Sequence, residues 1–165
     1  MTSKGEFTIT FRWHNLEQMS RVAALCATLW QPPAVVLMEG ELGVGKTALI
    51  QAVLKVWGVA TGVKSPTFDL VHLYQAECGA IYHADLYRIQ QAEELEMLDL
   101  PDGRSHQTLL VEWGHWLRDW YPDRWDADLT EDTQGSRMMT LTAVGSEPIK
   151  RMTTWEGRMH ANPRG

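Results

Sequence analysis

The sequence predicts an α/β fold of three layers, with helices on both faces of a mostly parallel sheet. Continuous apolar runs at residues 34–38 and 108–111 are typical of buried parallel strands. Segments with the apolar spacing of helices alternate with these strands along the chain. Such alternation generates parallel sheets, because each crossover connection returns the chain to the same edge.

The first strand and the first helix are predicted from periodicity. Residues 6–12 alternate between apolar and polar side chains, which indicates a half-buried strand. Asn15 is a helix-capping residue, and Gln18 occupies the capping-box position three residues later. An apolar face then runs through residues 16–30, and Pro32 ends this helix.

A phosphate-binding motif follows the strand at residues 34–38. Residues 40–47 read Gly-Glu-Leu-Gly-Val-Gly-Lys-Thr, which is the complete pattern G-x-x-x-x-G-K-[ST]. Its glycines allow the backbone to wrap around a phosphate, and the following helix presents its positive end to the anion. The lysine reaches the terminal phosphates, and the threonine hydroxyl reaches Mg²⁺. We therefore expect a P-loop NTPase fold, in which the nucleotide contacts Gly43, Val44, Gly45, Lys46, Thr47 and Ala48.

The remaining elements are predicted from similar signals. They are a helix from Leu49 to Trp57, strands at 68–74 and 80–85, a helix at 91–98, a strand at 108–112, a short helix at 114–121 and a strand at 137–144. The strands at 68–74 and 80–85 are expected to form an antiparallel hairpin. Residues 1–144 are thus predicted as a P-loop ATPase domain, and residues 145–165 as a loosely ordered tail.

The composition limits the classes of function. The chain of 165 residues has a formal charge of −6, which disfavours a large nucleic-acid-binding face. Its two cysteines, Cys26 and Cys78, are too far apart in sequence for a metal-binding pair and fit a reduced, cytoplasmic setting. No signal peptide is evident at the first residues, and no apolar run is long enough to cross a membrane.

Two acidic residues are candidates for the metal side of the site. Glu112 ends the predicted strand at 108–112, and Asp85 ends the strand at 80–85. Either carboxylate would lie near the phosphates, because ligands bind at the carboxyl ends of parallel strands. Thr67, in the sequence Ser-Pro-Thr, is either a γ-phosphate-sensing hydroxyl or an ordinary turn residue. His83 is interpreted as a strand histidine with a hydrogen-bond partner.

Four blocks together resemble the TsaE family, the bacterial P-loop ATPases of tRNA threonylcarbamoyladenosine biosynthesis. The blocks are residues 40–47, the sequence VKSPTF at 63–68, the sequence HADLYR at 83–88 and the sequence LVEW at 110–113. The resemblance implies a cytoplasmic protein that binds ATP and Mg²⁺ and hydrolyses ATP slowly. It also implies action through the TsaB and TsaD proteins, which modify adenosine 37 of tRNA, so that tRNA contact is indirect.

The resemblance assigns roles to individual residues. It implies that Lys46 and Thr47 serve the phosphates and metal, and that Glu112 is the metal-side acid. Asp85 resembles a further site acid, and Thr67 resembles the switch-loop hydroxyl. Arg137 matches an arginine near the last strand that contacts the nucleotide. Ala48 and Asp69 depart from the usual residues of the family at their positions.

Three other functions are compatible with a phosphate-binding loop. A small-molecule kinase needs an acceptor site and usually an arginine-rich lid, and the sequence has no arginine cluster of that kind. A GTPase is weakly supported, since the guanine-reading pattern Asn-Lys-x-Asp is absent. A nucleotide-gated assembly module, whose turnover is incidental, overlaps with the TsaE interpretation.

Overall fold

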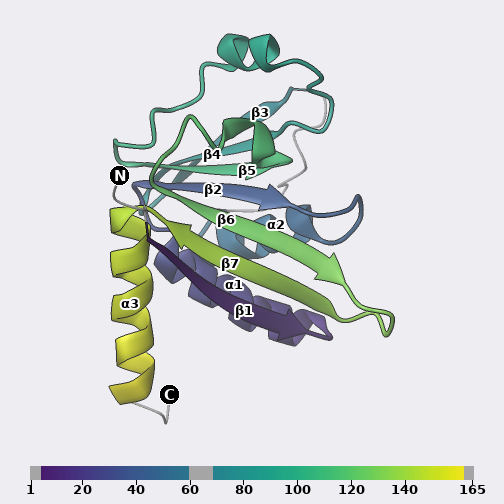
Figure 1. Ribbon diagram of the computed structural model, residues 1–165, viewed down its shortest axis with the longest axis vertical. Coiled ribbons are helices and arrows are strands. Elements are labelled where there is room, and N and C mark those ends of the chain that lie inside the picture. Colours follow the sequence, from purple (N-terminus) through teal and green to yellow (C-terminus); the bar gives the residue numbers. More distant parts are fainter. Residues whose placement is uncertain (1–4, 60–68, 162–165) are drawn as a thin grey trace.

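The described residues form one seven-stranded sheet with helices on both faces (Figure 1). The structure is a computed structural model that describes residues 5–59 and 69–161. Its elements are β1 (Glu6–Trp13), α1 (Leu16–Leu29), β2 (Ala34–Glu39), α2 (Lys46–Val56), β3 (Val71–Ala76), β4 (Gly79–Asp85), the 3₁₀ helix η1 (Ala92–Leu98), β5 (Gln107–Glu112), the 3₁₀ helix η2 (Gly114–Leu117), β6 (Arg124–Glu131), β7 (Arg137–Val144) and α3 (Ser146–Ala161).

The centre of the sheet is parallel and both of its edges are antiparallel. The strand order is β1-β7-β6-β2-β5-β4-β3, and the four central strands β6, β2, β5 and β4 run in the same direction. At one edge β3 and β4 form the predicted hairpin, and at the other β7 and β1 add two antiparallel pairings. The predicted α/β class is confirmed. Because these central strands are parallel, the carboxyl ends of β2, β5 and β4 lie together at the same end of the strands.

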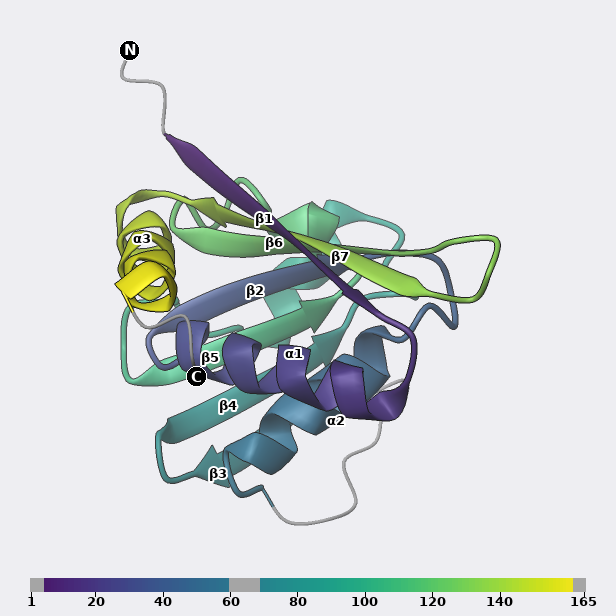
Figure 2. The ribbon, with the colours of Figure 1, turned by 90° about the horizontal axis from the view of Figure 1, so that it is seen from below.

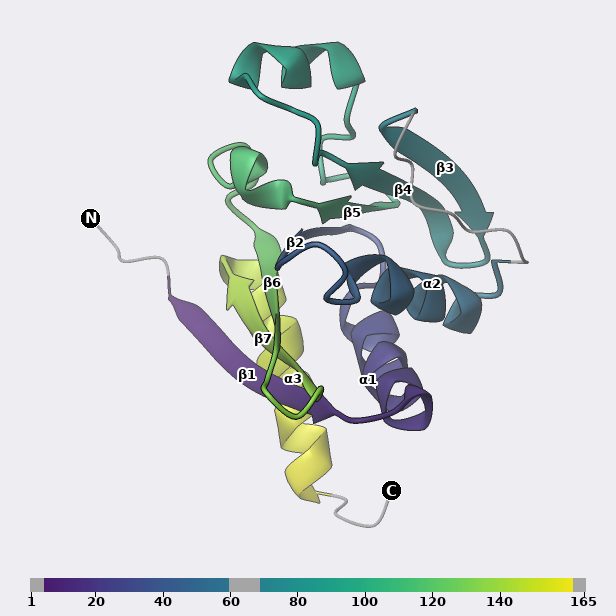
Figure 3. The ribbon, with the colours of Figure 1, turned by 90° about the vertical axis from the view of Figure 1, so that its right-hand side faces the viewer.

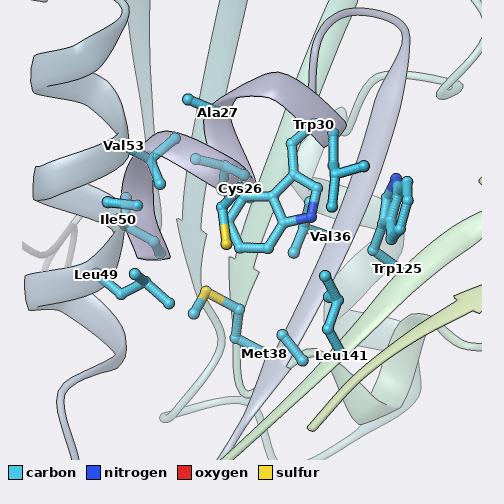
Figure 4. Close-up of a cluster of buried hydrophobic side chains, with 14 of the residues drawn as sticks. Cys26, Ala27, Trp30, Val36, Met38, Leu49, Ile50, Val53, Trp125 and Leu141 are labelled. Atoms are coloured by element: carbon cyan, nitrogen blue, oxygen red, sulfur yellow. The ribbon is translucent and has the colours of Figure 1, made fainter. Parts of the chain in front are cut away.

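Different elements cover the two faces of the sheet (Figure 3). Helices α1 and α2 lie side by side on one face, as Figure 2 shows. Their core is built around Trp30, which packs with side chains of α1, β2 and α2 (Figure 4). On the other face, η1 and η2 contribute Leu95 and Leu117 to a second core with Leu37 and Leu109. The helices expected at 91–98 and 114–121 are therefore short 3₁₀ segments.

The C-terminal segment corrects one expectation. Residues from 145 onward were expected to be loosely ordered, yet residues 146–161 form helix α3. Met152 is fully buried, while Ile149 and Trp155 pack against the same core cluster. These three residues are spaced to lie on one helical face, so the mixed polarity of the segment is that of an amphipathic helix. None of the helices in the described ranges is long and apolar enough to span a membrane.

Strand β6 is a second element that the sequence analysis did not predict. Trp125, Ala127 and Leu129 are buried and alternate with less buried polar residues along this strand. It inserts between β2 and β7, so Leu129 packs beside the glycine-rich loop that follows β2. The strand β6 therefore packs against the loop that follows β2.

Candidate functional site

The glycine-rich loop connects β2 to α2 at the carboxyl edge of the parallel strands. Gly40, Gly43 and Gly45 all have positive φ angles, of 144°, 82° and 114°. A Cβ atom at Gly40 would lie 2.6 Å from the carbonyl oxygen of Leu129, so a side chain does not fit there. Gly45 caps α2 in the left-handed conformation, which places Lys46 in its first turn. The glycines thus allow the loop to close against β6 and enter the helix.

Lys46 is held at the centre of this loop. Its Nζ atom donates to the carbonyl oxygens of Gly40, at 2.5 Å, and Glu41, at 3.1 Å, and lies 4.1 Å from the centroid of the Trp113 ring. Burial lowers the pKa of Lys46, and the nearby Glu112 carboxylate partly opposes this shift. A buried ammonium that faces carbonyl oxygens and an aromatic ring provides a local positive charge for an anion.

Thr47 and Glu112 meet beneath the loop. The Thr47 hydroxyl donates a hydrogen bond of 2.6 Å to Oε1 of Glu112, and this glutamate is only 3% exposed. Oε2 of Glu112 lies 2.8 Å from Nε2 of His83, which is fully buried. The parallel pairing of β2 and β5 brings Glu112 beside Met38, and Thr47 follows in the first turn of α2. Two residues 65 positions apart in sequence are thereby placed in contact.

Asp85 lies beside Glu112 at the next strand end. The two residues are paired in the register of β4 and β5, and both line the same cavity. Oδ1 of Asp85 accepts the backbone N–H of Tyr87 at 3.0 Å, so the carboxylate is anchored to the turn after β4. The structure therefore brings both predicted acids to the site. Of the two, Glu112 contacts Thr47 directly.

Two hollows open on either side of the loop. The first has a volume of about 370 Å³ and is lined by Leu42, Gly43, Gly45, Lys46, Thr47, Ala48, Asp85, Tyr87, Arg88, Glu112 and Trp113. The second has a volume of about 300 Å³ and is lined by Trp13, His14, Asn15, Leu16, Met19, Val44, Gly45, Ala48, Gly135 and Arg137. Gly45 and Ala48 line both, so the hollows adjoin at the start of α2. Lys46 lines the first hollow and Arg137 lines the second, so each hollow has a cationic side chain in its lining.

Arg137 holds the loop from the side of the second hollow. Its Nε atom donates to the carbonyl oxygen of Val44 at 2.9 Å, and its Nη1 atom donates to Glu131 at 2.7 Å. Because Arg137 begins β7, this contact ties the antiparallel edge of the sheet to the glycine-rich loop. A further hydrogen bond from Nη1 to the carbonyl oxygen of Gly135, at 2.9 Å, completes the contacts that position the guanidinium group beside the hollow.

The chemistry of the donor set fits Mg²⁺. A hydroxyl oxygen and carboxylate oxygens are the hard ligands that this ion prefers, and it commonly binds one or two carboxylates together with phosphates. Thr47 and Glu112 present such oxygens next to a cluster of backbone N–H groups at the start of α2. Asp85 offers a further carboxylate in the same cavity.

Comparison with known proteins identifies the family. The model of the family described as "Threonylcarbamoyl adenosine biosynthesis protein TsaE" matches residues 13–139, which is more than half of the chain. The chain belongs to the TsaE family. This confirms the resemblance seen in the four sequence blocks.

Relatives of this TsaE-family chain are about one third identical to it over the residues that align. The Bacillus subtilis protein named "tRNA threonylcarbamoyladenosine biosynthesis protein TsaE" is 31% identical over 84% of the chain and 87% of its own length. A Haemophilus influenzae protein of the same name is 33% identical over 70% of the chain and 75% of its own length. A third, from Rickettsia conorii, is 35% identical over 62% of the chain, and the match spans 59% of that protein.

The fold is shared with a solved structure. The crystal structure of Bacillus subtilis YdiB superposes with a TM-score of 0.74 at 24% identity, over 94% of this chain and 99% of that one. This likeness extends beyond the family match at residues 13–139 and supports the arrangement of the layers described above.

The site of the TsaE-family chain contains most of the predicted residues and some that the sequence analysis did not assign. Each of the following lines at least one of the two hollows: Gly43, Val44, Gly45, Lys46, Thr47, Ala48, Asp85, Glu112 and Arg137. Thr67 lies outside the described residues, so its role stays a prediction. Trp113, whose ring faces Lys46, and Tyr87, whose ring lies 5.1 Å from that of Trp113, add an aromatic wall. Trp113 has a φ angle of 59°. Its position directly after the strand-end acid Glu112 is the sequence feature that could have marked it as a site residue.

Proposed function

We propose that this TsaE-family chain binds ATP with Mg²⁺, hydrolyses ATP slowly, and thereby supports formation of the threonylcarbamoyl group on adenosine 37 of tRNA. The observation that carries the proposal is the hydrogen bond of 2.6 Å between Thr47 and Glu112 beneath the glycine-rich loop. A loop of this sequence binds phosphates, and a hydroxyl paired with a carboxylate at its helix end fits the metal side of a nucleotide site.

The two hollows divide the nucleotide between them in this proposal. The phosphates occupy the first, where the N–H groups at the start of α2 and the Lys46 ammonium face the anion. The base and ribose occupy the second, between Trp13 and Arg137. Gly45 and Ala48, which line both hollows, have small or no side chains and leave room for the connection between them.

The residues of the first hollow have separate tasks in hydrolysis. Thr47 and Glu112 hold Mg²⁺, which supplies charge stabilisation for the phosphates when bound. Lys46 releases its contacts with the loop carbonyls and pairs with the terminal phosphates. Asp85 orients an attacking water molecule, because its carboxylate is fixed by the Tyr87 N–H and faces the same cavity. The Ser-Pro-Thr segment with Thr67 senses the γ-phosphate.

The chain acts on tRNA through other proteins in this proposal. Its formal charge of −6 disfavours a surface that follows a phosphate backbone, since each neutralised phosphate requires a lysine or arginine. The relatives are named for tRNA threonylcarbamoyladenosine biosynthesis, which supports a place in that pathway. We place the chain in the cytoplasm, with the TsaB and TsaD proteins as its partners.

A reconstitution tests the proposal. The chain is purified and combined with TsaB and TsaD, and release of phosphate from ATP and modification of tRNA are measured. Lys46→Ala is expected to abolish both activities, because the phosphate loop loses its positive side chain. Unchanged nucleotide affinity and activity in a folded Lys46→Ala protein would contradict the phosphate role of the loop. Transfer of the phosphoryl group to a metabolite instead of water would favour a small-molecule kinase.

A further inference from the structure

A buried histidine contacts the acid at the centre of the site. His83 lies in β4, its side chain is fully buried, and its Nε2 atom is 2.8 Å from Oε2 of Glu112. Ile81, two residues earlier, packs into the core beneath α1 and α2, so His83 faces the same side of the sheet. On β5, Leu110 packs into the same core, so Glu112, two residues later, also faces that side of the sheet. The two side chains therefore meet on the α2 side of the sheet, directly below Thr47.

We propose that His83 is a positioning residue, which fixes the Glu112 carboxylate by donating its Nε2–H to Oε2. The inference rests on the proposed function, in which Glu112 serves the metal. Thr47 binds the other oxygen of the same carboxylate, so each oxygen of Glu112 has one protein donor. The donors come from α2 and β4, while the carboxylate comes from β5. A carboxylate anchored at both oxygens cannot rotate about its terminal bond, and its remaining lone pairs keep a fixed direction.

The other ring nitrogen indicates which tautomer is present. Nδ1 of His83 is buried and has no hydrogen-bond partner within residues 5–59 and 69–161. A proton on Nδ1 would be a buried donor without an acceptor, whereas a proton on Nε2 has the Glu112 carboxylate at 2.8 Å. The Nε2–H tautomer therefore satisfies the buried donor, and it is the form that can hold the carboxylate.

A positioning role and a purely structural role of His83 predict different effects when the ring is removed. A polar ring buried in a strand that is otherwise packed against the core has a desolvation cost that an apolar side chain avoids. If the ring only filled space, its loss would weaken folding without a specific effect on the metal. If it positions Glu112, its loss weakens the Mg²⁺-dependent part of nucleotide binding. Loss of a hydrogen bond to a metal-binding side chain typically costs 10–100-fold in metal affinity.

The test compares His83→Met with His83→Gln. These two replacements have similar length and shape, but only glutamine carries an N–H donor that can reach Glu112. Binding of ADP is measured by calorimetry with and without Mg²⁺, after circular dichroism has shown that each variant is folded. We expect His83→Met to reduce the Mg²⁺-dependent gain in affinity about 10–100-fold and to leave Mg²⁺-free ADP binding within about twofold of the wild type. His83→Gln should retain most of the gain.

Other results of this comparison would overturn the inference. A Mg²⁺-dependent gain in His83→Met equal to that of the wild type would show that the ring does not position Glu112. An equal loss in ADP affinity with and without Mg²⁺ would mark His83 as structural. If the wild-type chain binds ADP without any effect of Mg²⁺, the metal role in the proposed function fails, and this inference fails with it.

A second measurement uses the unmodified protein and does not depend on the folding of a variant. Nitrogen-15 NMR distinguishes the two histidine tautomers. Because the His83 side chain is fully buried, we expect its ring proton to exchange slowly, and this identifies its resonances. We expect the Nε2–H form, with the ring proton hydrogen-bonded to a carboxylate. The Nδ1–H form would overturn the inference, because Nε2 would then have no proton to donate.

Discussion

Truncation of Met152 tests whether helix α3 is part of the folded core. Met152 is fully buried between α3 and the core cluster beneath it. Met152→Ala removes Cγ, Sδ and Cε, and at about 0.8 kcal/mol for each buried methylene-sized group the lost transfer free energy is about 2 kcal/mol. The cavity left behind adds to this cost, since buried Met→Ala substitutions destabilise proteins by about 2–5 kcal/mol. We expect the free energy of unfolding to fall by about 3 kcal/mol.

The same helix contains a matched control. Met159 is 50% exposed, so Met159→Ala should change the free energy of unfolding by less than about 0.5 kcal/mol. The assay is thermal unfolding followed by circular dichroism, in which a change of 1 kcal/mol shifts the midpoint by about 2–4 °C for a chain of this size. Met152→Ala should therefore unfold about 6–12 °C below the wild type. Equal midpoints for the two variants would refute the packing of α3 against the sheet.

Two further predictions concern charge and the segment outside the described residues. Burial raises the pKa of Asp128 above its ordinary value of 3.8; the Arg118 guanidinium partly opposes this shift, and the Asp126 carboxylate adds to it. A carboxyl group with a raised pKa in the folded state contributes stability that is complete below pH 3.8 and is lost as the pH rises through the folded-state pKa. Asp128→Asn should therefore raise the urea midpoint relative to the wild type at pH 7 but not below pH 3.8, and a gain of the same size at both pH values would contradict this. Thr67→Ala should reduce ATP turnover more than ADP affinity, because a γ-phosphate-sensing hydroxyl has no contact once that phosphate has left; equal loss of ATP and ADP affinity would mark Thr67 as a turn residue.

The elements around the glycine-rich loop could be predicted because their signals are local. The apolar run of β2, the loop glycines and the apolar face of α2 are contiguous in sequence. In that order they indicate a strand, a phosphate-binding loop and a helix. The position of Glu112 at a strand end was also readable, since an apolar run ends directly before it. Its contact with Thr47 requires the pairing of β2 with β5. The fold class makes such a pairing plausible, but its register is not encoded in any local pattern.

The missed elements have weaker or conflicting local signals. In β6 the alternation of Trp125, Ala127 and Leu129 is present, but the acidic residues between them resemble a polar loop. In α3 the apolar face is only one residue wide per turn, and Gly157 interrupts the helix-forming residues. Both elements become stable through non-local packing, β6 between β2 and β7 and α3 against the core.

The contact between His83 and Glu112 could not be read from the sequence for a different reason. The two residues lie 29 positions apart, on strands whose pairing and register are set by the whole sheet. The strand-end acid Asp85, and not His83, is directly paired with Glu112 in that register. A hydrogen-bond partner for His83 was expected from its place in a strand, and only the three-dimensional arrangement identifies Glu112 as that partner.

The most direct test of the proposed function is phosphate release from ATP by the purified chain, measured with and without Mg²⁺ for the wild type and Glu112→Gln. The two side chains have nearly the same shape, but the amide lacks the charge that holds the metal in the proposed function. We predict that the wild type releases phosphate only when Mg²⁺ is present, and that Glu112→Gln loses at least about tenfold of this rate while still binding ADP. A silent Glu112→Gln beside an inactive Asp85→Asn would reverse the assignment of the two acids. Phosphate release that is unchanged in Glu112→Gln and independent of Mg²⁺ would contradict the account.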